Sequence, residues 1–279
     1  MTIYTANGRT VQYKGTTYPI NYLMNKIDWK TGKTYDRGTG KVRCDGHWLN
    51  GRFHGENIKM YNSAGVLQTI GHYREAIPYF SKEYNLEGKL RVEAYLEKNR
   101  YCGLVKKYGP KEELVFEGNF QNGLREGQGT EYWEVSQTNG KENVKKVQGT
   151  FYKNKLHGFD IKLYNKKGII AFEGSFSEDR REGYGMIYHP NGILEMAGKF
   201  KLDKLTDPYV RVFSTEGFPL YEGGYHNGYR RGFGKMYDLR GKLKAVGLFE
   251  GSHCVDERKP FFTKDHVGMF KKIMGVNMK

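Results

Sequence analysis

The sequence is poor in cysteine and in long apolar runs, and each shortage excludes a class of protein. Its 279 residues include three cysteines, Cys44, Cys102 and Cys254, which lie far apart. They form neither a CxxC pair nor an even-numbered disulfide framework, so we expect a reducing compartment. No run approaches the ~18 apolar residues of a membrane-spanning helix. The first twenty residues lack the features of a signal or transit peptide, and we therefore expect an intracellular, cytoplasmic protein.

The patterns of catalytic and cofactor sites are also missing. The eight histidines never stand at a metal-ligand spacing with cysteine or carboxylate residues. The Gly-x-Gly steps lack the third glycine and the strand-loop-helix context of a dinucleotide site. No Ser/His/Asp or Cys/His set can be assembled, and no signature of a nucleic-acid-binding motif is present. We therefore predict a protein that is not an enzyme, needs no cofactor and recognises no specific nucleic acid.

Glycine, aromatic and basic residues are abundant instead. The chain has 37 Gly, 22 Tyr, 16 Phe and 3 Trp against only seven Pro, which favours β structure with many tight turns. Its 46 basic and 31 acidic residues give a formal net charge of +15. A charge of this size attracts anionic phospholipid, nucleic acid or protein, and its sign alone does not choose among them.

A glycine flanked two residues away on each side by bulky residues recurs along the chain. These anchors are 23 to 25 residues apart, except for one interval of 31, and in one degenerate unit Ala94 takes the place of the glycine. They stand at Gly46, Gly71, Ala94, Gly118, Gly149, Gly174, Gly198, Gly223 and Gly247. A second pattern, aromatic-x-x-x-Gly, closes six residues before an anchor at Gly65, Gly88, Gly168, Gly192, Gly217 and Gly241. A period of about 24 residues held by two independent patterns indicates a tandem repeat array.

Each repeat has the pattern of a β-hairpin. The anchor and the bulky residues around it share one face of a strand, because alternate residues of a strand point the same way. Asn122-Gly123 and Asn227-Gly228 follow as typical two-residue hairpin turns. We predict an all-β fold, an elongated, twisted, single-layer antiparallel sheet of tandem β-hairpins, with one return strand broken at Asp207-Pro208.

The unit from Phe116 to Gly129 resembles the MORN (membrane occupation and recognition nexus) repeat, whose pattern is aromatic-x-Gly-x-aromatic-x-x-Gly-x-x-x-Gly-x-Gly. The unit from Tyr221 to Gly234 matches nearly as well, and the resemblance covers residues 46–251 well and residues 4–45 weakly. Proteins similar to this one are frequently cytoskeletal or ciliary components. The resemblance therefore implies a non-catalytic scaffold in a cytoskeletal, ciliary or axonemal assembly, although the family is functionally diverse.

Three regions follow from the repeat register. Residues 1–45 read as a divergent N-terminal repeat with an insertion, residues 46–251 as the MORN-type array, and residues 252–279 as a C-terminal segment. That segment is predicted to form a short amphipathic helix from Pro260, which either caps the last repeat or docks on a partner or membrane surface. Its apolar side carries Phe262, Met269, Phe270, Ile273 and Met274. Residues 133–146 lengthen one connection and are either a contact point or a tolerated insertion.

Aromatic residues two positions after the anchors form a stripe, which we call the +2 stripe: Trp48, Tyr73, Phe120, Phe151, Phe176, Phe200, Tyr225 and Phe249. The favoured interpretation is that most of these rings form the sheet's own core. A single layer has nothing to cover both of its faces, so part of the stripe is expected to remain as an apolar groove. Such a groove accepts a partner helix or extended peptide.

Charged residues flank this register. The glutamates next to the anchors, Glu117, Glu173 and Glu222, are predicted to point away from the aromatic face and to pair with Lys or Arg. Basic doublets are either a solvated face or contacts to acidic phospholipid, and comprise Lys166, Lys167, Arg180, Arg181, Arg230 and Arg231. Two functions result: a protein-interaction scaffold, or alternatively a membrane-apposed adaptor that binds acidic phospholipids through a basic face.

Overall fold

The computed structural model describes residues 3–4, 10–13, 16–19 and 32–257, apart from residues 37, 50–51, 135–136, 139 and 141–142. This part of the chain is all-β and contains no α-helix, which confirms the predicted fold class. The amphipathic helix predicted from Pro260 lies outside the described residues. The chain divides into two compact units, the first made of residues 1–158 and 166–168 and the second of residues 159–165 and 169–279.

The first unit is an antiparallel ladder of hairpins in which most consecutive strands pair with each other. Three short strands at its N-terminal end form a sheet of their own, and the two-residue strands β6 and β7 pair with each other. Its strands are β1 (Ile3–Tyr4), β2 (Thr10–Tyr13), β3 (Thr16–Pro19), β4 (Lys33–Tyr35), β5 (Val42–Asp45), β6 (Trp48–Leu49), β7 (Arg52–Phe53), β8 (Gly55–Tyr61), β9 (Leu67–Arg74), β10 (Ile77–Tyr84), β11 (Leu90–Glu97), β12 (Arg100–Tyr108), β13 (Leu114–Gln121), β14 (Leu124–Tyr132), β15 (Lys145–Tyr152) and β16 (Lys155–Leu156).

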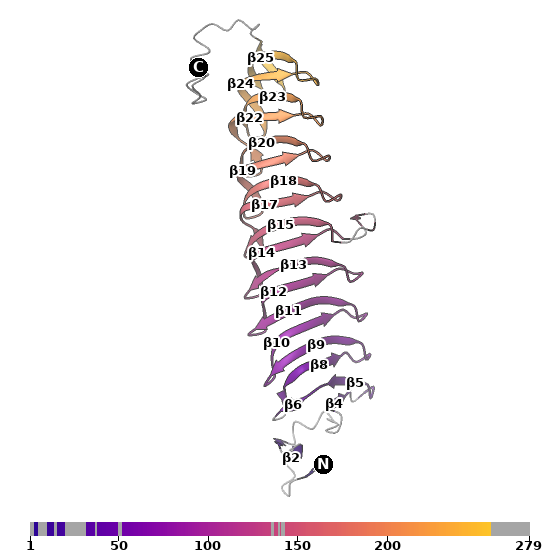
Figure 1. Cartoon of the computed structure of the whole chain (residues 1–279). Helices are drawn as coiled ribbons and strands as arrows, with labels where there is room; N and C mark the ends of the chain where they lie inside the picture. The colour runs from indigo at the N-terminus through magenta and orange to yellow at the C-terminus, as the bar shows by residue number, and fades with distance from the viewer. Residues whose placement is uncertain are drawn as a thin grey trace. The chain divides into compact units, whose positions relative to one another are not determined.

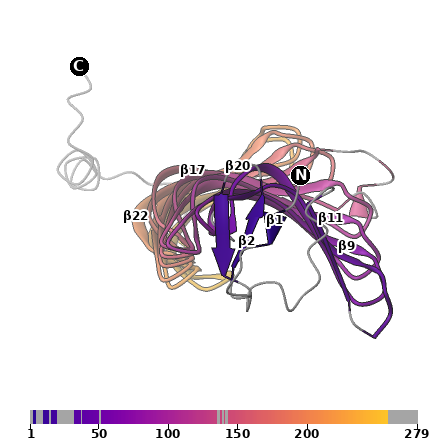
Figure 2. The same cartoon turned by 90° about the horizontal axis from the view of Figure 1, so that it is seen from below.

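The second unit repeats the same plan. Figure 1 shows consecutive hairpins of each unit side by side, and Figure 2 shows that the strands within each unit form a single layer. Its strands are β17 (Gly158–Tyr164), β18 (Ile170–Ser177), β19 (Arg180–Tyr188), β20 (Leu194–Lys201), β21 (Lys204–Leu205), β22 (Asp207–Phe213), β23 (Pro219–His226), β24 (Tyr229–Tyr237), β25 (Leu243–Glu250) and β26 (His253–Glu257).

The return strand predicted to break at Asp207-Pro208 is interrupted one residue earlier. β21 ends before Thr206, and β22 begins at Asp207 and includes Pro208. Its pairing with β23 shifts register between Asp207 and Val210. The return strands are interrupted in the same way at His54 and His157, where no proline follows, and the register of β8 shifts between Gly55 and Ile58. The proline is therefore accommodated at an irregularity that the repeat already has, and it does not end the strand.

The anchor glycines lie on the buried face of each strand. In β13, Phe116, Gly118 and Phe120 are buried, whereas Asn119 between them is exposed, as the period of two predicts. A Cβ atom at Gly118 would meet the Cα atom of Gly129 on β14 at 2.6 Å and the tip of the Phe116 ring at 2.8 Å. Glycine here lets the ring lie flat over the neighbouring strand.

The two-residue turns have the left-handed backbone of a type I′ hairpin. Asn122 and Gly123 have φ angles of 52° and 84°, as the Asn-Gly signal predicts. The same turn occurs without glycine at Glu75 and Ala76, with φ angles of 50° and 70°. The tandem ladder therefore imposes this geometry even on residues that disfavour it.

The connecting turns close on the glycine of the aromatic-x-x-x-Gly pattern. Gly65 has a φ of 83° and donates its N–H to the Asn62 carbonyl, while the Asn62 side chain accepts the N–H of Val66 at 2.9 Å. A polar residue after the aromatic caps the turn in this way at Asn62, Asn85, Asn165, Ser214 and Asp238. At one further turn Glu112 takes the place of the glycine with a φ of 61°.

Candidate interaction surfaces

The +2 stripe supplies much of the core in both units. Two of its members, Trp48 and Tyr225, are half-buried, and the others are no more than 9% exposed: Tyr73, Phe120, Phe151, Phe176, Phe200 and Phe249. The Phe172 and Phe176 rings meet edge to face, with centroids 5.4 Å apart and planes at 88°. Little of the stripe is therefore exposed to a partner, and the predicted groove along it stays a prediction.

In the first unit an arginine covers rings that a single layer would otherwise leave open. The guanidinium of Arg125 lies 4.5 Å from the Phe151 ring centroid and 5.7 Å from that of Phe116. It also donates to the carboxylate of Glu131 and, at 2.6 Å, to the carbonyl of Asn154. A planar cation with fixed donors suits this position, because it stacks on aromatic faces while its N–H groups stay bonded.

The second unit repeats the device with Arg181. Its guanidinium lies 4.9 Å from the Phe200 centroid and 5.5 Å from that of Phe172, and it donates at 2.9 Å to the Asp203 carbonyl. The neighbouring Arg180 is exposed. Arg181 therefore belongs to the core, whereas Arg180 faces solvent.

The doublet in β24 divides in the same way. Arg230 lies 4.7 Å from the Tyr221 ring centroid, whereas Arg231 is exposed. Of the four arginines predicted as contacts to an anionic surface, Arg180 and Arg231 are the exposed pair.

Lysine side chains gather around Trp133, where the lengthened connection begins. The ammonium groups of Lys146 and Lys166 lie 5.4 Å and 5.5 Å from the Trp133 ring centroid. Lys166 and the adjacent Lys167 are exposed. This Trp133 cluster brings a lysine of β15 and a lysine of the following connecting turn to one aromatic ring.

Some glutamates next to the anchors pair with the predicted basic residues, and some accept a hydrogen bond from a tyrosine. Lys162 lies 3.1 Å from Glu173, and Arg211 lies 3.6 Å from Glu222. The Tyr237 hydroxyl also donates to Glu222 at 3.0 Å. The same bond joins Tyr108 to Glu93 and Tyr132 to Glu117. The constant separation of 15 residues was visible in the sequence, but it points to a contact only once the pairing of the strands is known.

The face opposite the core carries exposed apolar residues at a second constant repeat position. Tyr184 pairs across strands with Lys199, and Phe233 pairs with Leu248, one residue from the buried row of anchor glycines. Tyr184 is 63% exposed and Phe233 is 45% exposed, while Tyr209 between them is half-buried. We call Tyr184, Tyr209 and Phe233 the outer stripe. Tyr184 and Phe233 are the middle residues of Gly-x-Gly steps, whereas Tyr209 follows Pro208 and has no such signal.

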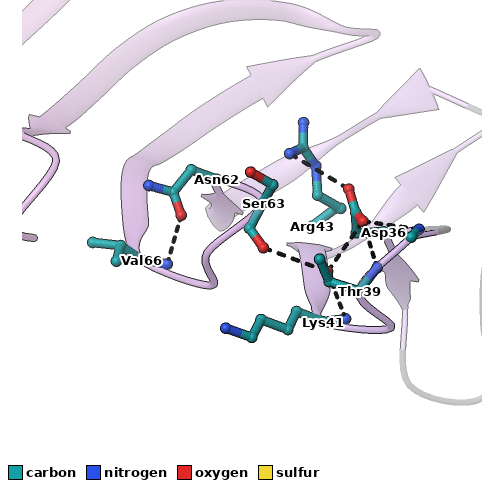
Figure 3. A network of polar contacts seen from close by, with 8 residues as sticks. Asp36, Thr39, Lys41, Arg43, Asn62, Ser63 and Val66 are labelled. Carbon is teal, nitrogen blue, oxygen red and sulfur yellow. Dashed lines mark hydrogen bonds and ion pairs between the residues drawn. The ribbon is translucent and has the colours of Figure 1, made fainter.

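Adjacent connecting turns of the first unit are joined by polar contacts (Figure 3). Asp36 accepts hydrogen bonds from the N–H and hydroxyl of Thr39, and these bonds hold the pKa of its carboxyl below the usual value, with a smaller contribution from Arg43. The Thr39 hydroxyl oxygen also lies 3.4 Å from the Ser63 carbonyl oxygen and shares its one proton between that oxygen and Asp36, and Lys41 donates to the Ala64 carbonyl at 2.7 Å. These contacts fix the spacing of consecutive turns.

Within the described part of the chain, no three His, Cys, Asp or Glu side chains gather in a way that would hold a metal ion. A helix long and apolar enough to cross a membrane is likewise not found there.

The comparisons identify the repeat. A family model of the MORN repeat matches residues 44–56, 116–136, 172–193 and 221–238. No curated protein matches the chain significantly. Among solved structures 47 chains match. One, from the crystal structure of TcdB2-TccC3, covers 89% of this chain at 11% identity with a TM-score of 0.21, and this chain spans 14% of its length.

Three of the matched segments are the hairpins β13–β14, β18–β19 and β23–β24, in which an arginine covers the aromatic core. MORN repeats form a non-enzymatic family whose members bind proteins or membranes. Four segments of the chain therefore match the MORN repeat.

Proposed function

We propose that this protein is a non-catalytic interaction scaffold whose rigid repeats hold partner proteins at a fixed spacing. The outer stripe carries this proposal, because Tyr184 and Phe233 are exposed on strands whose other face is already the core. Aromatic side chains exposed at a regular interval mark contact sites. The resemblance to MORN proteins supplies the location, a large cytoskeletal or ciliary assembly.

Pull-down with mass spectrometry tests the scaffold. The wild-type chain is compared with a Tyr184→Ser/Phe233→Ser variant and with the control Tyr229→Ser, whose ring is 69% exposed but lies outside the outer stripe. We expect the double variant to lose partners that the wild type and the control both retain. Equal capture by all three proteins would count against the outer stripe as a binding surface.

The Trp133 cluster favours a second candidate, a membrane-apposed adaptor. Exposed cations beside a tryptophan suit the boundary between anionic headgroups and acyl chains. Co-sedimentation with phosphatidylserine vesicles at two salt concentrations tests it, using Lys146→Glu/Lys166→Glu and a control at the exposed Lys111, Lys111→Glu. Binding that the double variant loses and the control keeps would support the adaptor. An absence of binding at physiological salt would remove it.

A further inference from the structure

We infer that the outer stripe of the second unit binds a proline-rich segment in the polyproline II conformation that carries acidic residues. This partner chemistry rests on the scaffold function proposed above.

The strands that lie between those of the outer stripe carry no aromatic ring at this position. On β20 the residue across from Tyr184 is Lys199. The pairing of Gly223 with Val210 on one side and with Gly234 on the other places Gly224 between Tyr209 and Phe233. Gly224 is buried and has no side chain, and a Cβ atom there would clash with the Arg231 carbonyl oxygen. Backbone alone therefore lies between those two rings, and a proline ring can stack over it between aromatic walls.

The spacing of the rings selects the conformation of the partner. Each repeat advances by two strands, so neighbouring rings stand ~9.6 Å apart. A polyproline II helix returns to the same face every three residues, after ~9.3 Å. An α-helix needs seven residues and ~10.5 Å to present the same face. From Tyr184 to Phe233 the accumulated mismatch is ~0.6 Å for polyproline II and ~1.8 Å for the α-helix, and an extended strand changes face after three residues.

The charges along the outer stripe select acidic residues in the partner. The Lys199 ammonium lies 5.7 Å from the Tyr184 ring centroid. The Arg211 guanidinium lies 5.7 Å from the Tyr209 centroid and donates to the Tyr209 hydroxyl at 3.0 Å. Although Arg211 is 3.6 Å from Glu222, its side chain remains 59% exposed. Carboxylates placed beside the prolines would contact both cations.

Fluorescence anisotropy with labelled 15-residue peptides tests the inference. The probe is five repeats of Pro-Pro-Glu. Its controls are five repeats of Gly-Ser-Glu, which have the same charge without the conformation, five repeats of Pro-Pro-Lys, and an acidic helical peptide with one leucine every seven residues. We expect only the Pro-Pro-Glu peptide to bind, and we expect Tyr184→Ser/Phe233→Ser to weaken it at least ~10-fold while Tyr229→Ser leaves it unchanged.

Lys199→Glu, which keeps every ring of the outer stripe, should also weaken binding, and unchanged thermal midpoints will show that all variants are folded. Failure of the Pro-Pro-Glu peptide to bind, equal binding by the double variant, or preference for the helical peptide would overturn the inference. If the peptide fails but the capture of partner proteins still depends on Tyr184 and Phe233, the proposed scaffold function is retained and only the polyproline II partner is rejected. If capture does not depend on these two residues, both proposals are rejected.

Discussion

The phenolic oxygen of Tyr132 lies 2.6 Å from a carboxylate oxygen of Glu117 and donates a hydrogen bond to it. Glu117 stands next to the anchor Gly118 in β13, and Tyr132 ends the return strand β14. The bond therefore ties the end of a hairpin to its middle on the face away from the core. Its recurrence in two further hairpins makes it a structural element of the repeat.

Tyr132→Phe should destabilise the first unit by about 1 kcal/mol, because Glu117 loses a half-buried hydrogen-bond donor. The free energy of unfolding in urea measures this change. Tyr184→Phe is the matched control, since its exposed ring should change stability by less than about 0.5 kcal/mol. Equal effects of the two substitutions would contradict a structural role for the bond.

Stability should fall at alkaline pH. Burial and then the bond to Glu117 raise the pKa of Tyr132 to about 12, whereas an unfolded tyrosine titrates near ~10. The folded protein therefore keeps a proton that the unfolded chain releases, and the stability present below pH ~10 is lost as the pH rises towards 12.

Urea unfolding at pH 9, 10 and 11 should show a steeper decline for the wild type than for Tyr132→Phe. Tyr184→Phe should decline as the wild type does. Parallel curves for all three proteins would show that the raised pKa of Tyr132 has no effect on folding.

Neighbouring arginines should differ in their effect on stability. Arg181→Met removes the cation over Phe172 and Phe200 together with the donor to the Asp203 carbonyl, and should cost about 2 kcal/mol. Arg180→Met at the exposed neighbour should cost less than about 0.5 kcal/mol. Thermal or urea unfolding of the two variants measures this difference in stability. A large loss from Arg180→Met would mean that exposure is a poor guide to which arginine belongs to the core.

The hairpin turn at Glu75 and Ala76, which contains no glycine, offers a stabilising substitution. Ala76 has a φ of 70°, so Ala76→Gly should stabilise the protein by about 0.5–1 kcal/mol by removing backbone strain. Gly123→Ala is the converse control, since Gly123 has a φ of 84° and alanine should destabilise by about 1 kcal/mol. Shifts of the same sign in the two variants would contradict a left-handed turn at one of them.

The hairpins were predictable because their signals are local. Asn122-Gly123 and the glycine of each aromatic-x-x-x-Gly pattern specify a left-handed backbone within a few residues, and two such signals per repeat fix the register. The turns at Ala76 and Glu112 lack those signals. They adopt the same backbone because the strands on either side are already paired, which no local pattern records.

The amino-acid pattern alone determined the period, the antiparallel hairpins and the aromatic face, since each depends on residues close together in the chain. Only the tertiary structure decided which basic residue covers a ring, which tyrosine bonds Glu117 and which aromatic side chains remain exposed. Arg180 and Arg181 are identical in type and adjacent, and they differ only in the face of the strand on which they lie. Arg181 pairs across strands with the buried Phe176 and Arg180 pairs with Ser177, after a two-residue shift of register between Gly174 and Phe176. Neighbours in a strand point to opposite faces, so the pairing between strands decides which of the two arginines shares the face of the core.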